Sequence, residues 1–244
     1  NYAFNSLKQF PVLRHSEGDK SILICPLPSQ IFNQITSGIY YLVKWTGSAG
    51  NALGKAFQGY VGDVLSASKL NKNYKIIPEE RFGKEEKDTV DWVVFDGNSA
   101  LFVECKTKRL TAHSKEELSP DENPIKDFDN MATAIVQVYK TIHDYRQNKY
   151  TSFPFIEKTK IYPIIVTMED WFLMGSHLVE IEKKVTTLMK EENLPAEWTN
   201  LMPYSICSIQ EFELISQLLN EVKISDIIET KQRDREMKEW TYHA

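Results

Sequence analysis

Two runs of β-forming residues, TVDWVVF and ALFVECK, stand on either side of the turn Asp96-Gly97-Asn98-Ser99. An Asp-Gly pair between such runs is among the strongest short-range signals for a β-hairpin, because glycine readily adopts the positive φ angles of a tight turn. We therefore expect two adjacent antiparallel strands here. The rest of the fold must be arranged around this hairpin.

Side chains alternate between the two faces of a strand, which fixes the partners of each residue in the second run. Glu104 and Lys106 share one face with Phe102, whereas Cys105 lies on the opposite face with the apolar residues. Asp91 opens the run DWVVF, and a tight hairpin returns the chain so that the start of the first strand lies beside the end of the second. We expect Asp91 to lie close to Glu104 and Lys106.

Two carboxylates about 4 Å apart repel each other by about 4 kcal/mol at an effective dielectric constant near 20, unless a cation or a proton compensates. Asp91 and Glu104 offer hard oxygen ligands without clustered His or Cys, which favours Mg²⁺ or Mn²⁺ over zinc. Such an ion acidifies a bound water, and Lys106 can position that water or stabilise negative charge. The neighbouring Lys108 and Arg109 are candidate phosphate contacts.

The remaining segments predict an α/β fold. Helical apolar spacing and β-rich runs give a helix over 51–70, the hairpin, a polar loop over 111–127, a helix over 127–146, a strand over 161–167, a helix over 177–191, a strand over 203–209 and a helix from 210 onward. Residues 1–50 read as irregular, with an amphipathic helix over 29–45. This order is typical of a mixed central β-sheet flanked by α-helices.

Composition excludes some classes of protein. The net charge of −5 argues against a protein that coats nucleic acid through bulk basicity, but it does not argue against a nuclease that gathers acid at its centre. Three well-separated cysteines without CxxC spacing suggest neither a disulfide framework nor a zinc site. No apolar run is long enough to span a bilayer, and the first residues do not resemble a signal peptide. We expect a cytoplasmic protein that does not associate with membranes.

The hairpin pattern, Asp91 followed after twelve residues by Glu104-Cys105-Lys106, resembles the PD-(D/E)XK nuclease superfamily. The preceding AFQGYVGDVL resembles the FExxVG-type helix of its restriction-endonuclease-like members, and the resemblance covers about residues 50–145. It implies that Asp91 and Glu104 are metal ligands, that the Cys105 carbonyl is a further ligand, and that Lys106 is the catalytic lysine. It also implies a restriction-endonuclease-like core.

The resemblance extends to the helices on either side of the hairpin, with one departure. Gln137 in AIVQVYK resembles the glutamine that many members place beside the site, and Lys140 would be a nearby phosphate or water contact. Where the family usually has a glutamate in the first helix, this chain has Gln58. The Gln58 side-chain carbonyl could still hold a metal-bound water or bind the metal weakly, but Gln58 removes one negative charge, so lower metal affinity and lost activity are both compatible with this change.

The sequence therefore predicts a metal-dependent nuclease acting on DNA, with RNA as the alternative substrate. The resemblance implies an endonuclease of a bacterial defence, restriction or mobile-element system, working as a homodimer or in a larger complex. We expect one nuclease-like domain over 1–244, with a variable N-terminal elaboration over 1–50, a catalytic core over 51–167, and C-terminal helices and a strand over 168–244. The rival predictions are a catalytically impaired nucleic-acid-binding module of the same fold and a protein-assembly subunit.

Overall fold

A computed structural model describes residues 7, 10–18, 20–33, 49–68, 74–83, 87–108, 124–171, 173 and 175–233. The chain divides into two compact units, Asn1–Lys55 and Ala56–Ala244. Helix α3 (Ala49–Ser68) begins in the first unit and continues in the second. The expected domain boundary at residue 50 stays a prediction.

The first unit contains a β-hairpin. Strands β1 (Leu13–Glu17) and β2 (Lys20–Ile24) pair antiparallel, with Leu13 opposite Ile24, and Gly18 supplies the positive φ of the turn at 59°. A short helix, α1 (Pro28–Asn33), follows. The prediction that residues 1–50 are irregular is therefore wrong for this hairpin. Only the first residues of the helix expected over 29–45 coincide with α1, and residues 34–48 lie outside the described part of the chain.

The second unit is built on a mixed five-stranded sheet in the order β3-β6-β7-β8-β9. Strands β3 (Lys75–Pro78), β6 (Trp92–Asp96) and β7 (Ser99–Lys106) pair antiparallel, whereas β7, β8 (Lys160–Thr167) and β9 (Ser205–Ser208) pair parallel. The predicted hairpin is confirmed, with a turn at Gly97 whose φ is 59°. A separate two-stranded ribbon pairs β4 (Arg81–Phe82) with β5 (Lys87–Asp88).

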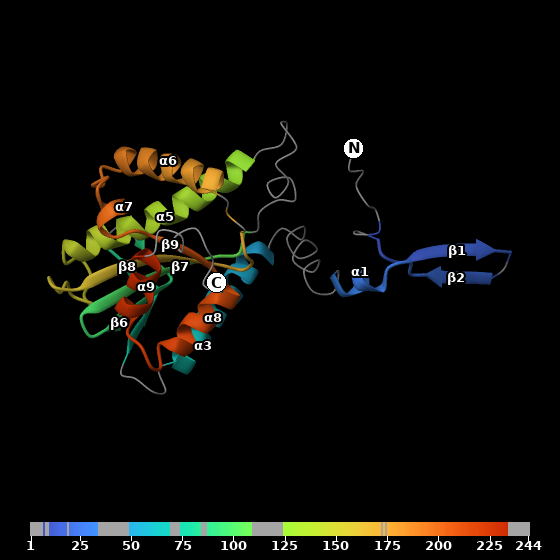
Figure 1. The fold of residues 1–244 in the computed structure, drawn as a ribbon, viewed down its shortest axis with the longest axis horizontal. Helices are drawn as coiled ribbons and strands as arrows, with labels where there is room; N and C mark the ends of the chain where they lie inside the picture. The colour runs from blue at the N-terminus through green and yellow to red at the C-terminus, as the bar shows by residue number, and fades with distance from the viewer. Residues whose placement is uncertain are drawn as a thin grey trace. The chain divides into compact units, whose positions relative to one another are not determined.

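Helices cover both faces of this sheet (Figure 1). On one face lie α5 (Pro124–Arg146), α6 (Gly175–Glu191) and α7 (Trp198–Leu201), and on the other lie α3, α8 (Ile209–Leu218) and α9 (Ile224–Arg233). Each face therefore has its own core. The expected mixed α/β sheet with flanking helices is confirmed.

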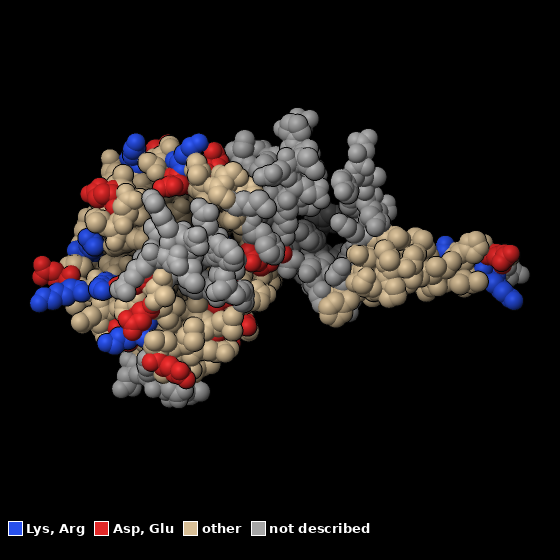
Figure 2. Space-filling model, in the orientation of Figure 1, with Lys and Arg blue, Asp and Glu red and all other residues tan. Residues whose placement is uncertain are grey.

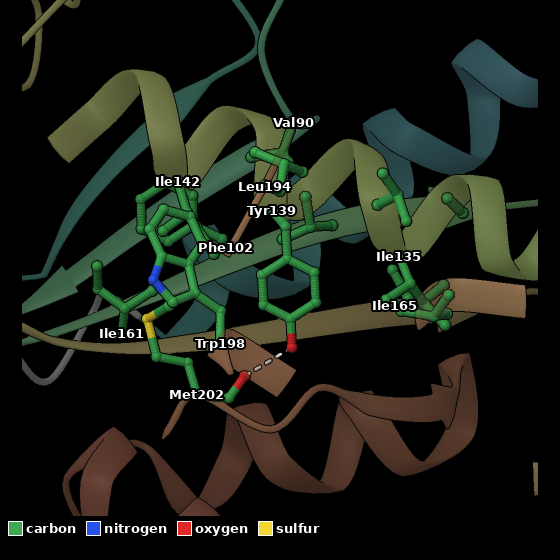
Figure 3. Close-up of a cluster of buried hydrophobic side chains, with 14 of the residues drawn as sticks. Val90, Phe102, Ile135, Tyr139, Ile142, Ile161, Ile165, Leu194, Trp198 and Met202 are labelled. Carbon is green, nitrogen blue, oxygen red and sulfur yellow. Dashed lines mark hydrogen bonds between the residues drawn. The ribbon is translucent and has the colours of Figure 1, made fainter. Parts of the chain in front are cut away.

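The α5 side of the sheet holds the larger core, part of which Figure 3 shows. Phe102 and Ile165 of the sheet pack against Ile135 and Tyr139 of α5, and all four are fully buried. The Tyr139 hydroxyl donates a hydrogen bond of 2.7 Å to the Met202 carbonyl, which ties the segment after α7 to α5. Each large apolar side chain buried in this way contributes about 1.5–3 kcal/mol.

The opposite core contains the apolar stripe predicted for the first helix. Phe57, Val61 and Leu65 of α3 are buried against Leu101 and Val103 of β7. Because Phe102 points to the α5 core and its two neighbours point to the α3 core, the face assignment made from the alternation in ALFVECK is confirmed.

Three elements differ from the sequence-based prediction. Residues 75–78 form β3, a strand that was not predicted from the sequence, and the predicted C-terminal helix is divided into α8 and α9 by residues 219–223. The polar loop expected over 111–127 ends at α5, which begins at Pro124 because proline fits the first helical turn without losing a hydrogen bond. Of the helices that the structure describes, none is both long and apolar enough to cross a bilayer.

Candidate active site

The candidate site lies at one edge of the central sheet, where β7 and β8 end together. Lys106, the last residue of β7, stands opposite Thr167, the last residue of β8. Asp91 directly precedes β6, whose first residue Trp92 pairs with Val103 of β7. The antiparallel hairpin thus brings Asp91 to the carboxyl-terminal edge of the parallel strands, the edge at which α/β sheets usually bind ligands.

Asp91 is held against β7 by a main-chain hydrogen bond. The Cys105 amide donates to Asp91 Oδ2 at 2.6 Å, a charge-assisted contact that fixes the carboxylate beside Glu104. Strand alternation puts Asp91 on the side of Val93 and Phe95, which face the α5 core as Phe102 does. Asp91 and Glu104 therefore lie on the same side of the sheet, as the sequence predicted.

Glu104 and Lys106 form a direct ion pair. Lys106 Nζ donates to Glu104 Oε1 at 2.6 Å, and the Glu104 side chain is only 8% exposed whereas the Lys106 side chain is 36% exposed. A buried carboxylate without a partner is strongly unfavourable, so the Lys106 ammonium compensates it in this state. The partly exposed Lys106 side chain therefore lies between the buried Glu104 carboxylate and the solvent.

The three groups shift one another's protonation. Burial raises the pKa of Glu104 to about 7, although the Lys106 ammonium acts against this shift, and the Asp91 carboxylate adds to it. The pKa of Asp91 is also raised, first by burial, against the hydrogen bond from Cys105 and the charge of Lys106. Burial is the largest influence on the pKa of Lys106 and acts to lower it, but the charge and hydrogen bond of Glu104 together with the charge of Asp91 outweigh burial and leave this pKa above its usual value. Lys106 therefore stays charged at neutral pH.

This pair of acids suits a hard divalent cation, since carboxylate oxygens are the ligands that Mg²⁺ and Mn²⁺ prefer. In the described part of the chain, no three His, Cys, Asp or Glu side chains form a complete metal-ligand set. Burial, followed by the neighbouring carboxylates, raises the pKa of the Cys105 thiol well above its usual range, so the thiol is neutral. The expected ligand at this residue is its carbonyl, and that role stays a prediction.

Gln137 of α5 faces the same region. Its side chain lines a pocket of about 210 Å³ together with Lys106, Lys108 and Trp171; the other lining residues are Asn130, Met131, Thr133 and Ala134. The Trp171 indole N–H donates to the Lys108 carbonyl at 3.2 Å and closes one wall. The helix predicted behind the hairpin therefore does bring Gln137 to the lysine, and it adds Asn130 and Thr133, which the sequence did not indicate.

The predicted phosphate contacts have different surroundings. Lys108 Nζ lies 3.2 Å from a carboxylate oxygen of the buried Asp127, so this lysine also anchors the first turn of α5. Lys140 lies one turn beyond Gln137, and its ammonium pairs with Glu192 at 2.9 Å in an exposed contact of the kind that contributes little stability. Arg109 lies outside the described residues. The phosphate roles of all three residues stay predictions.

Gln58 bonds to Glu79 and to Trp92 in the structure, and its role at a metal stays a prediction. Its side-chain amide donates to Glu79 Oε2 at 3.1 Å, while its main-chain carbonyl accepts a 3.0 Å hydrogen bond from the Trp92 indole. Glu79 was not predicted as a site residue, because the short strand β3 that ends beside it was not recognised. The pair Ile76-Ile77 before Pro78 is a weak signal for such an edge strand, since proline is tolerated at sheet edges.

Comparisons with known proteins give little direct guidance. No protein-family model matches the chain, and no curated protein matches it. Among solved structures, the small subunit of the heterodimeric restriction endonuclease R.BspD6I is similar, with a TM-score of 0.38 and 12% sequence identity over 74% of this chain and 75% of that one. The functional argument therefore depends on the site itself.

Proposed function

We propose that this protein is a nuclease that uses Mg²⁺ or Mn²⁺ to hydrolyse phosphodiester bonds in DNA. The observation that carries the proposal is the convergence of Asp91, Glu104 and Lys106 at one edge of the sheet. A buried acid and a half-buried one, both with raised pKa values, beside a charged lysine are unfavourable for stability alone, and such arrangements cluster at functional sites.

Each residue has a defined task in this proposal. Asp91 and Glu104 hold the cation, which when bound supplies polarisation of the scissile phosphate and a more acidic water. Lys106 stabilises the negative charge that develops as the water oxygen bonds to phosphorus and one P–O ester bond breaks. Gln137 lines the same pocket as this lysine and would offer an amide to a phosphate oxygen or to the attacking water. The leaving oxygen takes up a proton and departs as an alcohol.

Recognition of nucleic acid would be local in this protein. Figure 2 shows Lys and Arg side chains mixed with Asp and Glu side chains on the visible face of the second unit, in agreement with the net charge of −5. Lys106 and Lys108 at the pocket provide positive charge where a phosphate would enter. DNA as the substrate, and a bacterial restriction, defence or mobile-element role, follow from the PD-(D/E)XK resemblance, as does assembly into a homodimer or larger complex.

The direct test is cleavage of supercoiled plasmid, linear duplex and single-stranded DNA, and of RNA, with Mg²⁺ or Mn²⁺ supplied or omitted. We expect metal-dependent cleavage of DNA by the wild-type protein and a loss of about 100-fold or more for Lys106→Ala. Lys160→Ala is the matched control, because Lys160 begins β8 at the other end of the sheet and forms an exposed pair with Glu229. This control should cleave like the wild type.

A non-catalytic binding or assembly module is the competing function, and the neutral Gln58 is the observation that favours it. The same assay separates the two. Absence of cleavage of every substrate with either metal, together with retained nucleic-acid or protein binding, would favour the module and contradict the nuclease. Cleavage that does not change in Lys106→Ala would show that another site carries the activity.

A further inference from the structure

Glu79 lies beside the candidate site because β3 pairs with β6. Pro78, the last residue of β3, stands opposite Trp92, and the Glu79 amide donates to the Asp91 carbonyl at 2.8 Å. The main chain of Glu79 is therefore fixed next to Asp91. Because Pro78 stands opposite Trp92 and Trp92 stands opposite Val103, the adjoining residues Glu79, Asp91 and Glu104 follow one another across the three strands at this edge of the sheet.

Gln58 donates to this carboxylate from the opposite layer of the fold. Its side-chain nitrogen lies 3.1 Å from Glu79 Oε2, and its own main chain is tied to β6 through Trp92. An ionised carboxylate has two oxygens and about four acceptor positions, so one hydrogen bond from Gln58 leaves capacity for a cation or a cation-bound water. Because Glu79 is exposed, its side chain can turn toward an arriving ion without disturbing a packed core.

The charges around the site favour a third acid. Asp91 and Glu104, when ionised, leave a net charge of −1 after the Lys106 ammonium is counted. A divalent cation is better compensated by a net charge of −2. Glu79 adds one negative charge and brings the total to this value. The first-helix carboxylate that the sequence lacks at residue 58 can thus come from the end of a neighbouring strand.

We propose that Glu79 supplies the third carboxylate acting on the cation of this site, directly or through one of its waters, and that Gln58 is a positioning residue that orients Glu79. This inference rests on the proposed metal-dependent function. In this proposal the Gln58 side-chain amide does not contact the ion but holds the Glu79 carboxylate. Glu79, which the sequence did not indicate, then takes the place of Gln58 as a ligand.

The test is Mn²⁺ affinity, measured by the loss of the free-ion electron paramagnetic resonance signal and by calorimetry, without DNA. We expect Glu79→Gln to weaken Mn²⁺ binding about tenfold or more, because a full charge near the ion is lost. The double variant Glu79→Gln/Gln58→Glu exchanges carboxylate and amide across the same hydrogen bond and should recover most of the affinity. Glu80→Gln removes the same charge one residue away, where Glu80 accepts a hydrogen bond from the Ser152 hydroxyl, and should bind Mn²⁺ within about twofold of the wild type.

The outcomes separate this inference from the proposed function. If the wild type binds Mn²⁺ and Glu79→Gln binds it equally well, the role of Glu79 is overturned while the nuclease proposal stands. If Glu79→Gln binds Mn²⁺ more weakly and the double variant Glu79→Gln/Gln58→Glu recovers none of the lost affinity, the positioning role of Gln58 is overturned. If the wild type binds no Mn²⁺, both proposals fail. Circular dichroism of each variant confirms that the fold is retained.

Discussion

Glu104 is a buried acid that folding alone does not favour. The residue is 6% exposed, and its carboxylate forms an ion pair with the ammonium of Lys106 at 2.6 Å. Replacement of a buried ion pair by apolar residues is often neutral or stabilising, so such a pair is weak evidence for a structural role. At the edge of the sheet, beside Asp91 and a pocket, the pair is better explained by the chemistry of the site.

The raised pKa of Glu104 predicts a specific pH dependence of stability. Because the pKa moves upward from 4.5 to about 7 on folding, the folded state binds this proton more tightly than the unfolded state. The resulting stabilisation is complete below about pH 4.5 and is lost as the pH rises through about 7. Glu104→Gln is neutral at every pH and lacks this loss, so from pH 5 to pH 8 the wild type should lose stability relative to the variant.

Urea unfolding of both proteins at pH 5 and pH 8, in a metal-free buffer, measures this difference. Lys106 remains charged at both pH values. The effect of the substitution on the Lys106 ammonium is therefore the same at pH 5 and at pH 8 and cancels from the comparison. A stability difference between the two proteins that is the same at pH 5 and pH 8 would contradict the titration of Glu104 near neutral pH.

At the residue scale, the positions of Asp91 and Glu104 could be predicted from the sequence, whereas that of Glu79 could not. Asp91, Glu104 and Lys106 follow from strand alternation on either side of a strong turn signal, which fixes both spacing and face. Gln58 departs from the pattern of the family that the sequence resembles, but its partner depended on a contact between segments 21 residues apart. Glu79 could not be found from periodicity, since β3 has only four residues and ends in proline.

At the element scale, α3 approaches the hairpin at Gly62. A Cβ atom on this glycine would lie 2.2 Å from Cζ2 of the Trp92 ring, so the helix and β6 can pack this closely only without a side chain here. Trp92 directly follows Asp91, and its indole also bonds to the main chain of α3. The packing of one helix thus fixes the start of the strand that directly follows Asp91.

Gly62→Ala should therefore destabilise the protein by about 1–3 kcal/mol, because the clash with Trp92 outweighs the better helix propensity of alanine. Gly59→Ala, in the same helix with open space around the new Cβ, should instead stabilise the protein by up to about 1 kcal/mol. Chemical denaturation of the two variants and the wild type provides the comparison. Equal effects of the two substitutions would show that the contact with Trp92 does not limit the helix.

Helices and strands that are long and bounded by clear turn residues could be predicted from the sequence, and short ones without such signals could not. The hairpin, α5 and β8 combine long periodic or β-rich runs with clear turn residues, and the structure confirms them. The ribbon β4–β5 has two residues in each strand, and the N-terminal hairpin exposes both faces, so neither has a hydrophobic pattern to read. The division between α8 and α9 carries no proline or glycine to mark it.

At the scale of the whole molecule, both hydrophobic cores belong to the second unit. Among the described residues, every member of the two buried clusters lies between Phe57 and Ile228. The strands of the first unit are exposed along their whole length, and an isolated two-stranded hairpin is marginally stable at best in water. The sheet that carries the site should therefore fold without the N-terminal hairpin.

Removal of residues 1–48, up to the start of α3, tests this independence. We expect the shortened chain to unfold in a cooperative thermal transition within about 4 °C of the full chain, the shift that about 1 kcal/mol produces in a unit of this size. Differential scanning calorimetry of both chains measures it. A loss of the cooperative transition in the shortened chain would show that the first unit completes the fold.

The central claim is that Asp91 and Glu104 bind one divalent cation. It is tested most directly by calorimetric titration of Mn²⁺ into the wild-type protein and into the double variant Asp91→Asn/Glu104→Gln at pH 8, above the pKa of about 7 that Glu104 has in the wild type. We predict one saturable site in the wild type and no measurable binding in the double variant. Binding of Mn²⁺ with equal affinity and stoichiometry in both proteins would contradict the account.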